Sequence, residues 1–255
     1  MVPAPAGYVR FAAGGAEIVA RAEHADAVRE AVRGGTLYEW AERHPSARGF
    51  AGRGVAWAAL LPDGRTSIVV RHSRHGGLLA RLTGDRFLAP TRAPRELAAA
   101  LRLAAAGVPT PEVVAYATYA AGPGFRRADV ATREIPSGRD LAWVLTNPPD
   151  AEALARIVHA VHRLLVRLYE CGARHPDLNV KNILLAPYDA PEPVAYVLDV
   201  DRVVFDAPRA RAVWHANVRR LVRSWTKWRE RHGALVDVAP FAAPWAPEPG
   251  AMAGR

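Results

Sequence analysis

The sequence predicts a mixed α+β fold in two lobes, a small sheet-rich lobe followed by a mainly helical lobe. Strand-like segments gather before about residue 134, and the longest amphipathic helical pattern begins at residue 151. A short stretch, Pro-Ser-Gly-Arg-Asp-Leu, separates the two regions. With 255 residues, of which 50% are hydrophobic, the chain is long enough to bury one large core or two smaller ones around a cleft.

The first strands are predicted directly after an N-terminal extension, residues 1–48, which is mixed in pattern and has an unclear role. An apolar run, a Pro-Asp-Gly turn and the β-branched run 68–70 are together typical of an antiparallel hairpin. Gly52 and Gly54 lie just before the first strand of this hairpin. We therefore place the beginning of the sheet-rich lobe at residue 49.

The next elements follow from periodicity. Apolar residues recur at helical spacing between Leu97 and Ala105, and a Gly-x-Pro sequence that would end the helix follows. Two further strands are predicted at 113–119 and 128–135. The segment 151–169 carries the strongest amphipathic helical pattern and opens the core of the second lobe.

Charge and cysteine content narrow the function classes without deciding between them. The formal net charge is +9, which favours an anionic partner such as phosphate, nucleic acid or a membrane surface. Much of the excess is Arg, which a GC-rich genome also enriches, so charge is supporting evidence only. Cys171 is the single cysteine, so no internal disulfide is possible. Without a signal-like N-terminus or a long apolar run, we expect a cytoplasmic protein that is not integral to a membrane.

Oxygen-bearing side chains cluster in two short segments of the second lobe. The first, 174–185, is RHPDLNVKNILL and places Asp177 and Asn182 five residues apart before an apolar strand. The second, 197–203, is VLDVDRV and brings Asp199 to the end of another apolar strand. Turn or capping roles would not require this spacing in both strand contexts. Hard cations take oxygen ligands, so the set suits a magnesium ion beside a hydroxyl nucleophile, as phosphoryl transfer requires.

These segments resemble the catalytic loop and metal-binding motif of the protein-kinase-like superfamily. HPDLNVKNILL, LDVDR and the later W-x-x-N-x-x-x-L-x-R-S, from Trp214 to Ser224, are more closely similar to the lipopolysaccharide core kinases. The nearest group is the 3-deoxy-D-manno-octulosonic acid (Kdo) kinases. Upstream segments extend the resemblance over roughly residues 49–228: GRG, RHSRHGG, DRFL, and REL with GVPTPEVVA. The resemblance implies a two-lobed protein-kinase-like fold, with an N-lobe at 49–134 and a C-lobe at 135–255.

The resemblance also implies roles for individual residues. Asp177 would be the base that orients and deprotonates the acceptor hydroxyl. Asn182 and Asp199 would hold Mg²⁺ on the phosphates of ATP. Gly52 and Gly54 would let backbone N–H groups approach these phosphates, where a Cβ would obstruct them.

Glu96 would match the helix glutamate that pairs with a basic residue on the third strand of the N-lobe, and that basic residue aligns with Arg71. The superfamily usually has Lys there, and the planar guanidinium is not equivalent to an ammonium. Either Arg71 contacts the phosphates bidentately, or Arg74 or Arg81 does so instead. Asp201, which stands where the superfamily has glycine, would either assist the metal or anchor Arg202.

The expected function is ATP-dependent phosphorylation of a sugar hydroxyl of the lipopolysaccharide inner core, most closely Kdo on a lipid A precursor. His175 is expected to orient this site by bonding the backbone near Asp199. Two rival functions remain: a kinase for a protein or a soluble small molecule of the aminoglycoside type, and a pseudokinase that binds nucleotide without transfer. The intact Asp177, Asn182 and Asp199 argue against the pseudokinase.

The last predicted helix lies within residues 206–233 and is rich in Arg and Trp. Val218, Leu221, Val222 and Trp225 mark one face of it, and basic residues cover much of the rest. The helix is either a C-lobe helix with a basic outer face or a surface that meets anionic lipid headgroups or a phosphorylated glycolipid. We expect an anionic glycolipid or sugar substrate, peripheral contact with the cytoplasmic face of the inner membrane, and no nucleic acid.

Overall fold

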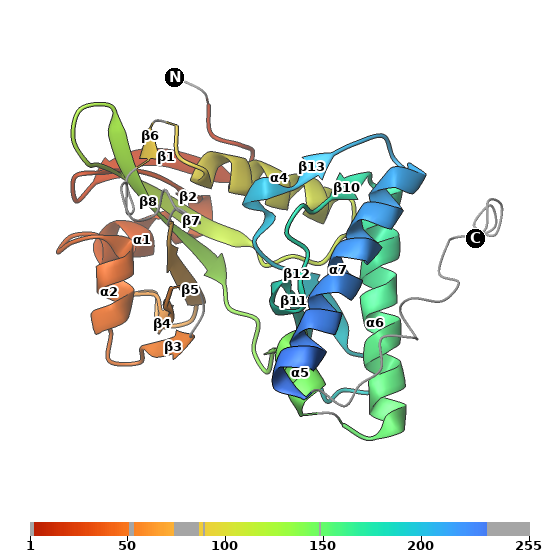
Figure 1. Ribbon diagram of the computed structural model, residues 1–255. Coiled ribbons are helices and arrows are strands. Elements are labelled where there is room, and N and C mark those ends of the chain that lie inside the picture. The colour runs from red at the N-terminus through yellow and green to blue at the C-terminus, as the bar shows by residue number, and fades with distance from the viewer. Residues whose placement is uncertain (1–2, 51–53, 74–86, 89, 148, 234–255) are drawn as a thin grey trace. The chain divides into compact units, whose positions relative to one another are not determined.

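The computed structural model describes residues 3–50, 54–73, 87–88, 90–147 and 149–233 (Figure 1). The chain divides into two compact units, each with its own core. The first, here called the sheet unit, comprises Met1–Ala98 and Pro111–Glu134. The second, the helical unit, comprises Ala99–Thr110 and Ile135–Arg255. The predicted α+β class with a strand-rich first part and a mainly helical second part is confirmed.

An eight-stranded antiparallel sheet forms the centre of the sheet unit. Its strands follow the order β1-β2-β7-β8-β5-β4-β3, and β6 pairs with β8. The strands are β1 (Tyr8–Ala13), β2 (Ala16–Arg21), β3 (Arg48–Phe50), β4 (Ala56–Leu60), β5 (Ser67–His72), β6 (Phe87–Leu88), β7 (Val113–Ala120) and β8 (Phe125–Arg133). The predicted hairpin is present as β4 and β5, whose register pairs Ala56 with Arg71.

Helices pack on this sheet because their apolar side chains continue its core. Besides the 3₁₀ turn η1 (Ala22–His24), the sheet unit contains α1 (Ala25–Ala31) and α2 (Leu37–Arg43). Val28 and Leu37 from these two helices lie in one buried cluster with Ile18 and Ile68 from the strands. The predicted helix α4 (Ala93–Ala105) begins in the sheet unit and ends in the helical unit.

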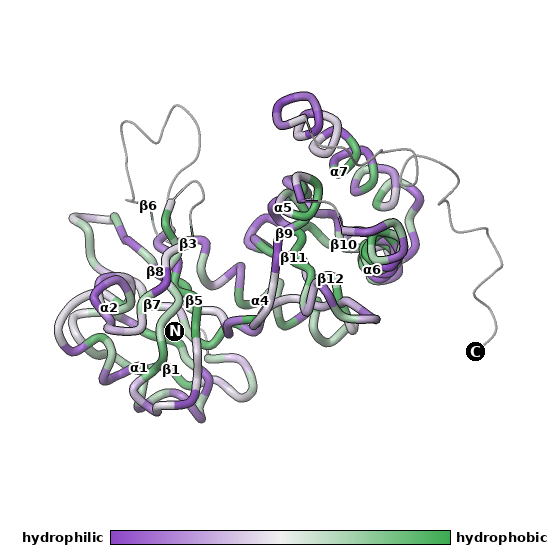
Figure 2. Tube along the Cα trace, turned by 90° about the horizontal axis from the view of Figure 1, so that it is seen from below, coloured by the Kyte–Doolittle hydropathy of each residue, from purple (hydrophilic) through white to green (hydrophobic). Residues whose placement is uncertain are grey.

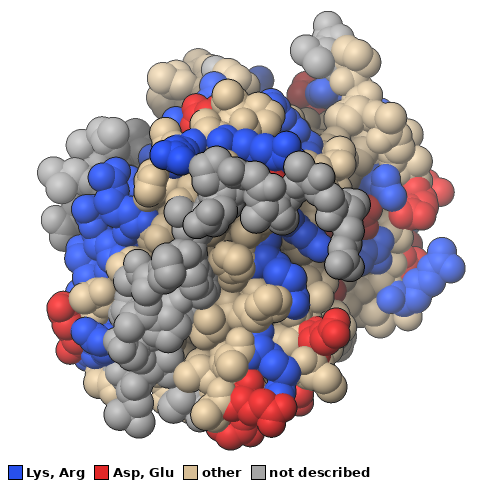
Figure 3. Space-filling model, turned by 90° about the vertical axis from the view of Figure 1, so that its right-hand side faces the viewer, with Lys and Arg blue, Asp and Glu red and all other residues tan. Residues whose placement is uncertain are grey.

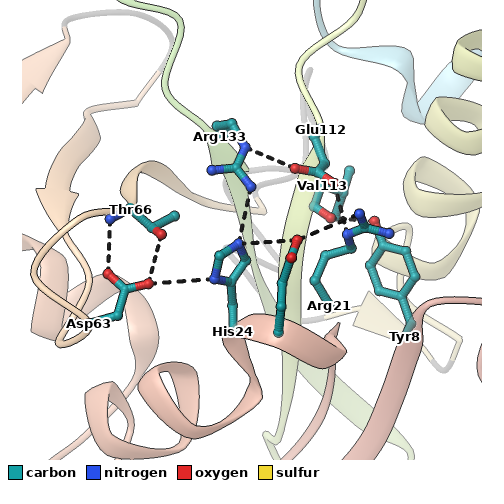
Figure 4. Close-up of polar contacts among 9 residues, drawn as sticks. Tyr8, Arg21, His24, Asp63, Thr66, Glu112, Val113 and Arg133 are labelled. Carbon is teal, nitrogen blue, oxygen red and sulfur yellow. Dashed lines mark hydrogen bonds and ion pairs between the residues drawn. The ribbon is translucent and has the colours of Figure 1, made fainter.

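The N-terminal segment, to which the sequence assigned no role, is part of the sheet unit. It supplies β1 and β2 at one edge of the sheet, and a polar network joins it to the later strands (Figure 4). Glu112 lies between two arginines, 2.8 Å from Arg21 Nε and 2.9 Å from Arg133 Nε. Arg133 also contacts His24 Nε2 at 3.0 Å, and His24 Nδ1 lies 3.5 Å from the Asp63 carboxylate. Charged groups from four chain segments therefore hold residues 1–48 to the sheet.

The helical unit is organised around α6 (Ala151–Glu170) and α7 (Arg211–His232), which lie side by side (Figure 1). Most of the predicted apolar stripe of α6 is buried, including Ile157, Val161 and Leu164, whereas Leu154 and Val158 are only partly buried. Helix α5 (Leu141–Thr146) and strand β11 (Ile183–Ala186) are largely apolar, as the green tube in Figure 2 shows. Within the described residues, no helix is long and apolar enough to cross a membrane.

Short strands complete the helical unit. One small sheet has the order β12-β11-β9 and the other pairs β10 with β13. Their bounds are β9 (Arg139–Asp140), β10 (Ala173–Arg174), β12 (Val194–Val197) and β13 (Val204–Phe205). Gly172 lies between α6 and β10 at φ +72°, and a Cβ there would come within 2.3 Å of the Asp206 carbonyl oxygen. Only glycine fits this turn, which leads directly into the segment that contains Asp177.

Candidate active site

His175 connects the two polar segments that the sequence singled out. Its ring is buried, and its Nδ1 accepts a hydrogen bond of 3.2 Å from the backbone N–H of Asp177. Since Nδ1 is an acceptor, Nε2 carries the proton and donates it to the Leu198 carbonyl at 3.0 Å. Leu198 directly precedes Asp199, so His175 makes the backbone contact that the sequence predicts.

Asn182 provides a second connection. Its side-chain Nδ2 donates to the backbone carbonyl of Asp177 at 2.9 Å, and its backbone carbonyl accepts from Leu198 N–H at 2.9 Å. Because the Asp177 carbonyl can only accept, the Asn182 side-chain amide points its NH₂ group toward it, and the Asn182 Oδ1 is the oxygen left to bind a cation. The catalytic-loop segment and the segment that carries Asp199 thus form one hydrogen-bonded structure.

Asp199 adopts a left-handed backbone conformation, with φ 55° and ψ 50°. This conformation costs a non-glycine residue on the order of 1 kcal/mol, although aspartate tolerates it better than most residues. Asp199 lies two residues after the end of β12 and directly before the 3₁₀ turn η3 (Val200–Arg202), and its side chain is exposed. A strained carboxylate at a strand end is typical of a functional site.

Two polar side chains of helix α7 form hydrogen bonds with the segment that contains Asp177. Asn217 is buried; its Oδ1 accepts from His175 N–H at 3.0 Å and its Nδ2 donates to the Ala173 carbonyl at 2.9 Å. Ser224 Oγ accepts from the N–H of Val180 at 3.2 Å. Both polar residues belong to the W-x-x-N-x-x-x-L-x-R-S motif, from which no individual role was predicted for them. A role for Asn217 could have been inferred from its position, because it is an asparagine on the otherwise apolar face of a predicted helix.

In the sheet unit, the structure pairs Arg71 with Glu96. Arg71 lies on β5, Glu96 lies in the first turn of α4, and the guanidinium forms an ion pair with the buried carboxylate. Gly54 lies in an exposed bend just before β4. Gly52, Arg74 and Arg81 lie outside the described residues, so the choice between Arg71 and the two later arginines stays a prediction.

The predicted site residues therefore form two local groups. Arg71, Glu96 and Gly54 belong to the sheet unit, whereas Asp177, Asn182 and Asp199 belong to the helical unit. Across the described part of the chain, no three His, Cys, Asp or Glu side chains are grouped so that they could hold a metal by themselves. Mg²⁺ usually takes only one or two protein ligands besides substrate phosphates and water, so an amide oxygen and a carboxylate fit it.

Sequence reasoning missed a buried histidine–aspartate contact next to Arg71. His72 Nδ1 lies 2.6 Å from Asp129 Oδ1, and the Asp129 side chain is fully buried. Buried carboxylates are rare unless they are paired. The available signal was an aspartate inside the strand-like run Ala-Asp-Val-Ala on β8.

Asp140 is another acidic residue that the structure withdraws partly from solvent, and it lies beside the segment that contains Asn182. Its side chain caps α5 by accepting from the N–H of Trp143 at 2.7 Å. Burial raises the pKa of Asp140, while this hydrogen bond and the charge of Lys181 act in the opposite direction. The Lys181 ammonium also lies 5.0 Å from the centre of the Trp228 ring on α7.

The hydrogen bonds around Asp177, Asn182 and the Asp199 turn fit the predicted phosphotransferase, and comparison of the chain with known families decides the class. The family described as "Lipopolysaccharide kinase (Kdo/WaaP) family" matches residues 38–237. The chain therefore belongs to the lipopolysaccharide kinase (Kdo/WaaP) family. It is a kinase that acts on a sugar hydroxyl and uses ATP.

Relatives with the name "3-deoxy-D-manno-octulosonic acid kinase" align over most of the chain. The protein of Vibrio parahaemolyticus is 29% identical over 202 residues, which cover 74% of this chain and 79% of the relative. The protein of Xanthomonas oryzae pv. oryzae is 34% identical over 207 residues, covering 78% of this chain and 76% of the relative. A solved structure titled "WaaP in complex with acyl carrier protein" aligns with a TM-score of 0.49 at 20% identity, covering 82% of this chain and 89% of that chain. The relatives favour none of the rival functions, whether protein kinase, aminoglycoside-type kinase or pseudokinase.

Proposed function

We propose that the protein transfers the γ-phosphoryl group of ATP to a hydroxyl of a Kdo residue on a lipid A precursor, with Mg²⁺ as the metal ion. The observation that carries this proposal is the hydrogen-bonded connection of Asp177, Asn182 and the Leu198–Asp199 turn through His175. The names of the relatives supply the acceptor.

In this mechanism Asp177 accepts the proton of the acceptor hydroxyl as that oxygen attacks phosphorus. Its backbone N–H and carbonyl are both bound, by His175 and Asn182, so the carboxylate starts from a fixed main-chain position. The Asn182 Oδ1 and the Asp199 carboxylate would hold Mg²⁺. When bound, this ion neutralises charge on the phosphates and aligns them for transfer.

The sheet-unit residues would act on the phosphates of ATP. Arg71 would donate two parallel N–H bonds to them, a geometry that guanidinium offers and ammonium does not. The Glu96 carboxylate limits the positions that the guanidinium can adopt. Gly54, with Gly52, would allow close approach of backbone N–H groups.

A phosphoryl-transfer assay with ATP and Mg²⁺ tests the proposal. The acceptor panel contains a Kdo-bearing lipid A precursor, the same precursor without Kdo, a soluble aminoglycoside and a generic protein substrate. We expect transfer only to the Kdo-bearing precursor. Better transfer to the aminoglycoside or the protein would replace the proposed acceptor class, and nucleotide binding without transfer to any acceptor would indicate a pseudokinase.

The basic face of α7 suggests how such an enzyme reaches a glycolipid. Leu221 and Trp225 are buried, whereas four basic residues of the helix are exposed to solvent: Arg219, Arg220, Arg223 and Lys227. The side of the molecule drawn in Figure 3 carries several areas of Lys and Arg side chains. Each basic residue near an anionic bilayer contributes about 1 kcal/mol of binding free energy. We propose peripheral binding to the cytoplasmic face of the inner membrane through this face, here called the basic face.

Charge reversal of the four residues of the basic face is expected to weaken binding to anionic vesicles and to lower transfer to glycolipid more than basal ATP hydrolysis. Binding of the wild-type protein should also fall as salt rises, because ions screen the attraction. Co-sedimentation with anionic and neutral vesicles measures both effects. The matched control reverses four exposed arginines of the sheet unit and changes the net charge equally: Arg33, Arg43, Arg65 and Arg95. Equal losses in both variants, or no loss in either, would contradict a role specific to α7.

A further inference from the structure

Helix α2 begins with a complete capping box. The Thr36 hydroxyl accepts from Glu39 N–H at 3.1 Å, and the Glu39 carboxylate accepts from Thr36 N–H at 3.0 Å. These two hydrogen bonds give partners to the backbone N–H groups of the N-cap residue and of the third helical residue. The N–H groups of the first and second helical residues need other partners, because no residue within the helix can accept from them.

The sheet supplies both partners. Leu37 N–H donates to the Tyr119 hydroxyl at 2.8 Å, and Tyr38 N–H donates to Asp129 Oδ2 at 3.0 Å. The other oxygen of Asp129 is bound to His72 on β5. Burial, and after it the Asp129 carboxylate, raises the pKa of Tyr119. The first turn of α2 is thus attached to β7, β8 and β5 by buried polar contacts that leave it little freedom.

The side chain of Tyr38 connects the first turn of α2 to the backbone that directly follows Gly54. Its hydroxyl donates to the Val55 carbonyl at 3.0 Å and accepts from the indole N–H of Trp57 at 3.1 Å. Its ring packs edge-on against His72, with ring centres 5.7 Å apart. Val55 directly follows Gly54. A residue of the N-terminal part of the chain therefore holds the backbone next to a glycine to which we assign phosphate binding.

We infer that Tyr38 is a positioning residue for ATP, because it fixes the Gly54–Val55 backbone in the conformation that receives the phosphates. This inference rests on the proposed function, in which Gly54 lies against the phosphates. Glycine loses more conformational entropy than any other residue when it becomes ordered. A hydrogen bond that orders its neighbour before the nucleotide arrives reduces the entropy lost on binding. Tyr38 is itself held at both ends, because Trp57 donates to its hydroxyl and Asp129 accepts from its backbone N–H.

The test compares Tyr38→Phe with Tyr8→Phe. Tyr38→Phe deletes one hydroxyl and keeps the ring against His72. Tyr8 is the matched control, because its hydroxyl also donates to a backbone carbonyl of the sheet unit, that of Val113 at 2.6 Å. We expect Tyr38→Phe to raise the KM for ATP about threefold to tenfold, the range that one hydrogen bond supplies. The KM for the acceptor and the Kd for adenosine, which lacks phosphates, should stay unchanged.

Tyr8→Phe should lower the melting temperature and leave the KM for ATP as it is. The inference is overturned if the wild-type protein binds ATP more tightly than adenosine but Tyr38→Phe shows the wild-type KM for ATP. It is also overturned if adenosine affinity falls as much as ATP affinity, since a general structural role would then explain the loss. A wild-type protein that does not distinguish ATP from adenosine would instead remove the proposed phosphate site, and the inference with it.

Discussion

Replacing Asp177 by alanine is expected to remove nearly all phosphoryl transfer while the protein stays folded and keeps its affinity for ATP. Loss of a positioned base costs about two to four orders of magnitude in rate. The hydrogen bonds around Asp177 that involve His175 and Asn182 use its backbone, so the substitution leaves them in place. Single-turnover transfer to the Kdo-bearing precursor measures the rate, and calorimetry measures ATP affinity and the melting temperature.

Asp189→Ala is the matched control for this prediction. Asp189 is an exposed carboxylate of the same unit, in the turn after β11, so its loss changes the charge equally. Near-normal turnover in Asp177→Ala would show that Asp177 is not the base. A drop in melting temperature large enough to explain the lost activity would assign it a structural role instead.

Asp199→Ala and Asn182→Ala are each expected to weaken binding of the magnesium–ATP complex by about tenfold or more. Loss of an outer partner of a metal ligand already costs about 10- to 100-fold in metal affinity, so loss of a direct ligand should cost at least as much. The affinity for ATP in the presence of a chelator should not change. Titration of nucleotide with and without Mg²⁺ measures both quantities.

Asn182 requires a second variant, because its Nδ2 also donates to the Asp177 carbonyl. Asn182→Asp keeps an oxygen and loses this donor, so it should retain more magnesium-dependent affinity than Asn182→Ala. Equal affinity of the wild type, Asp199→Ala and Asn182→Ala for the magnesium–ATP complex would exclude the metal site.

Asp201→Ala separates the two roles open for that residue: altered magnesium dependence indicates metal binding, and a lower melting temperature alone indicates an anchor for Arg202.

Elements with a strong local pattern could be predicted from the sequence. Helix α6 has its buried positions where the apolar stripe of period 3.6 places them, and β4 and β5 flank the predicted turn. The two-residue strands β9, β10 and β13 could not be predicted. A strand of two residues has no period to detect and exists only because a partner strand lies beside it.

The N-terminal segment shows the same limit on a larger scale. Its strands β1 and β2 were not predicted, although they pair with each other and β2 pairs with β7. The pairing brings Ile18 opposite Ala117, about a hundred residues later in the chain. No local pattern encodes such a partner, so the sequence left residues 1–48 as an extension without a role.

The sequence by itself identified the family and predicted Asp177, Asn182 and Asp199 as site residues, because a motif of polar side chains at set spacing is a local feature. Only the tertiary structure showed what holds them. Asn217 bonds His175 across 42 positions of the chain, and Tyr38 bonds Asp129 across 91. Buried polar groups must find partners wherever the fold brings them, and those partners are set by packing rather than by nearness in sequence. The short motifs therefore predict the chemistry of this kinase, whereas the hydrogen bonds that support the predicted site residues are seen only in the folded chain.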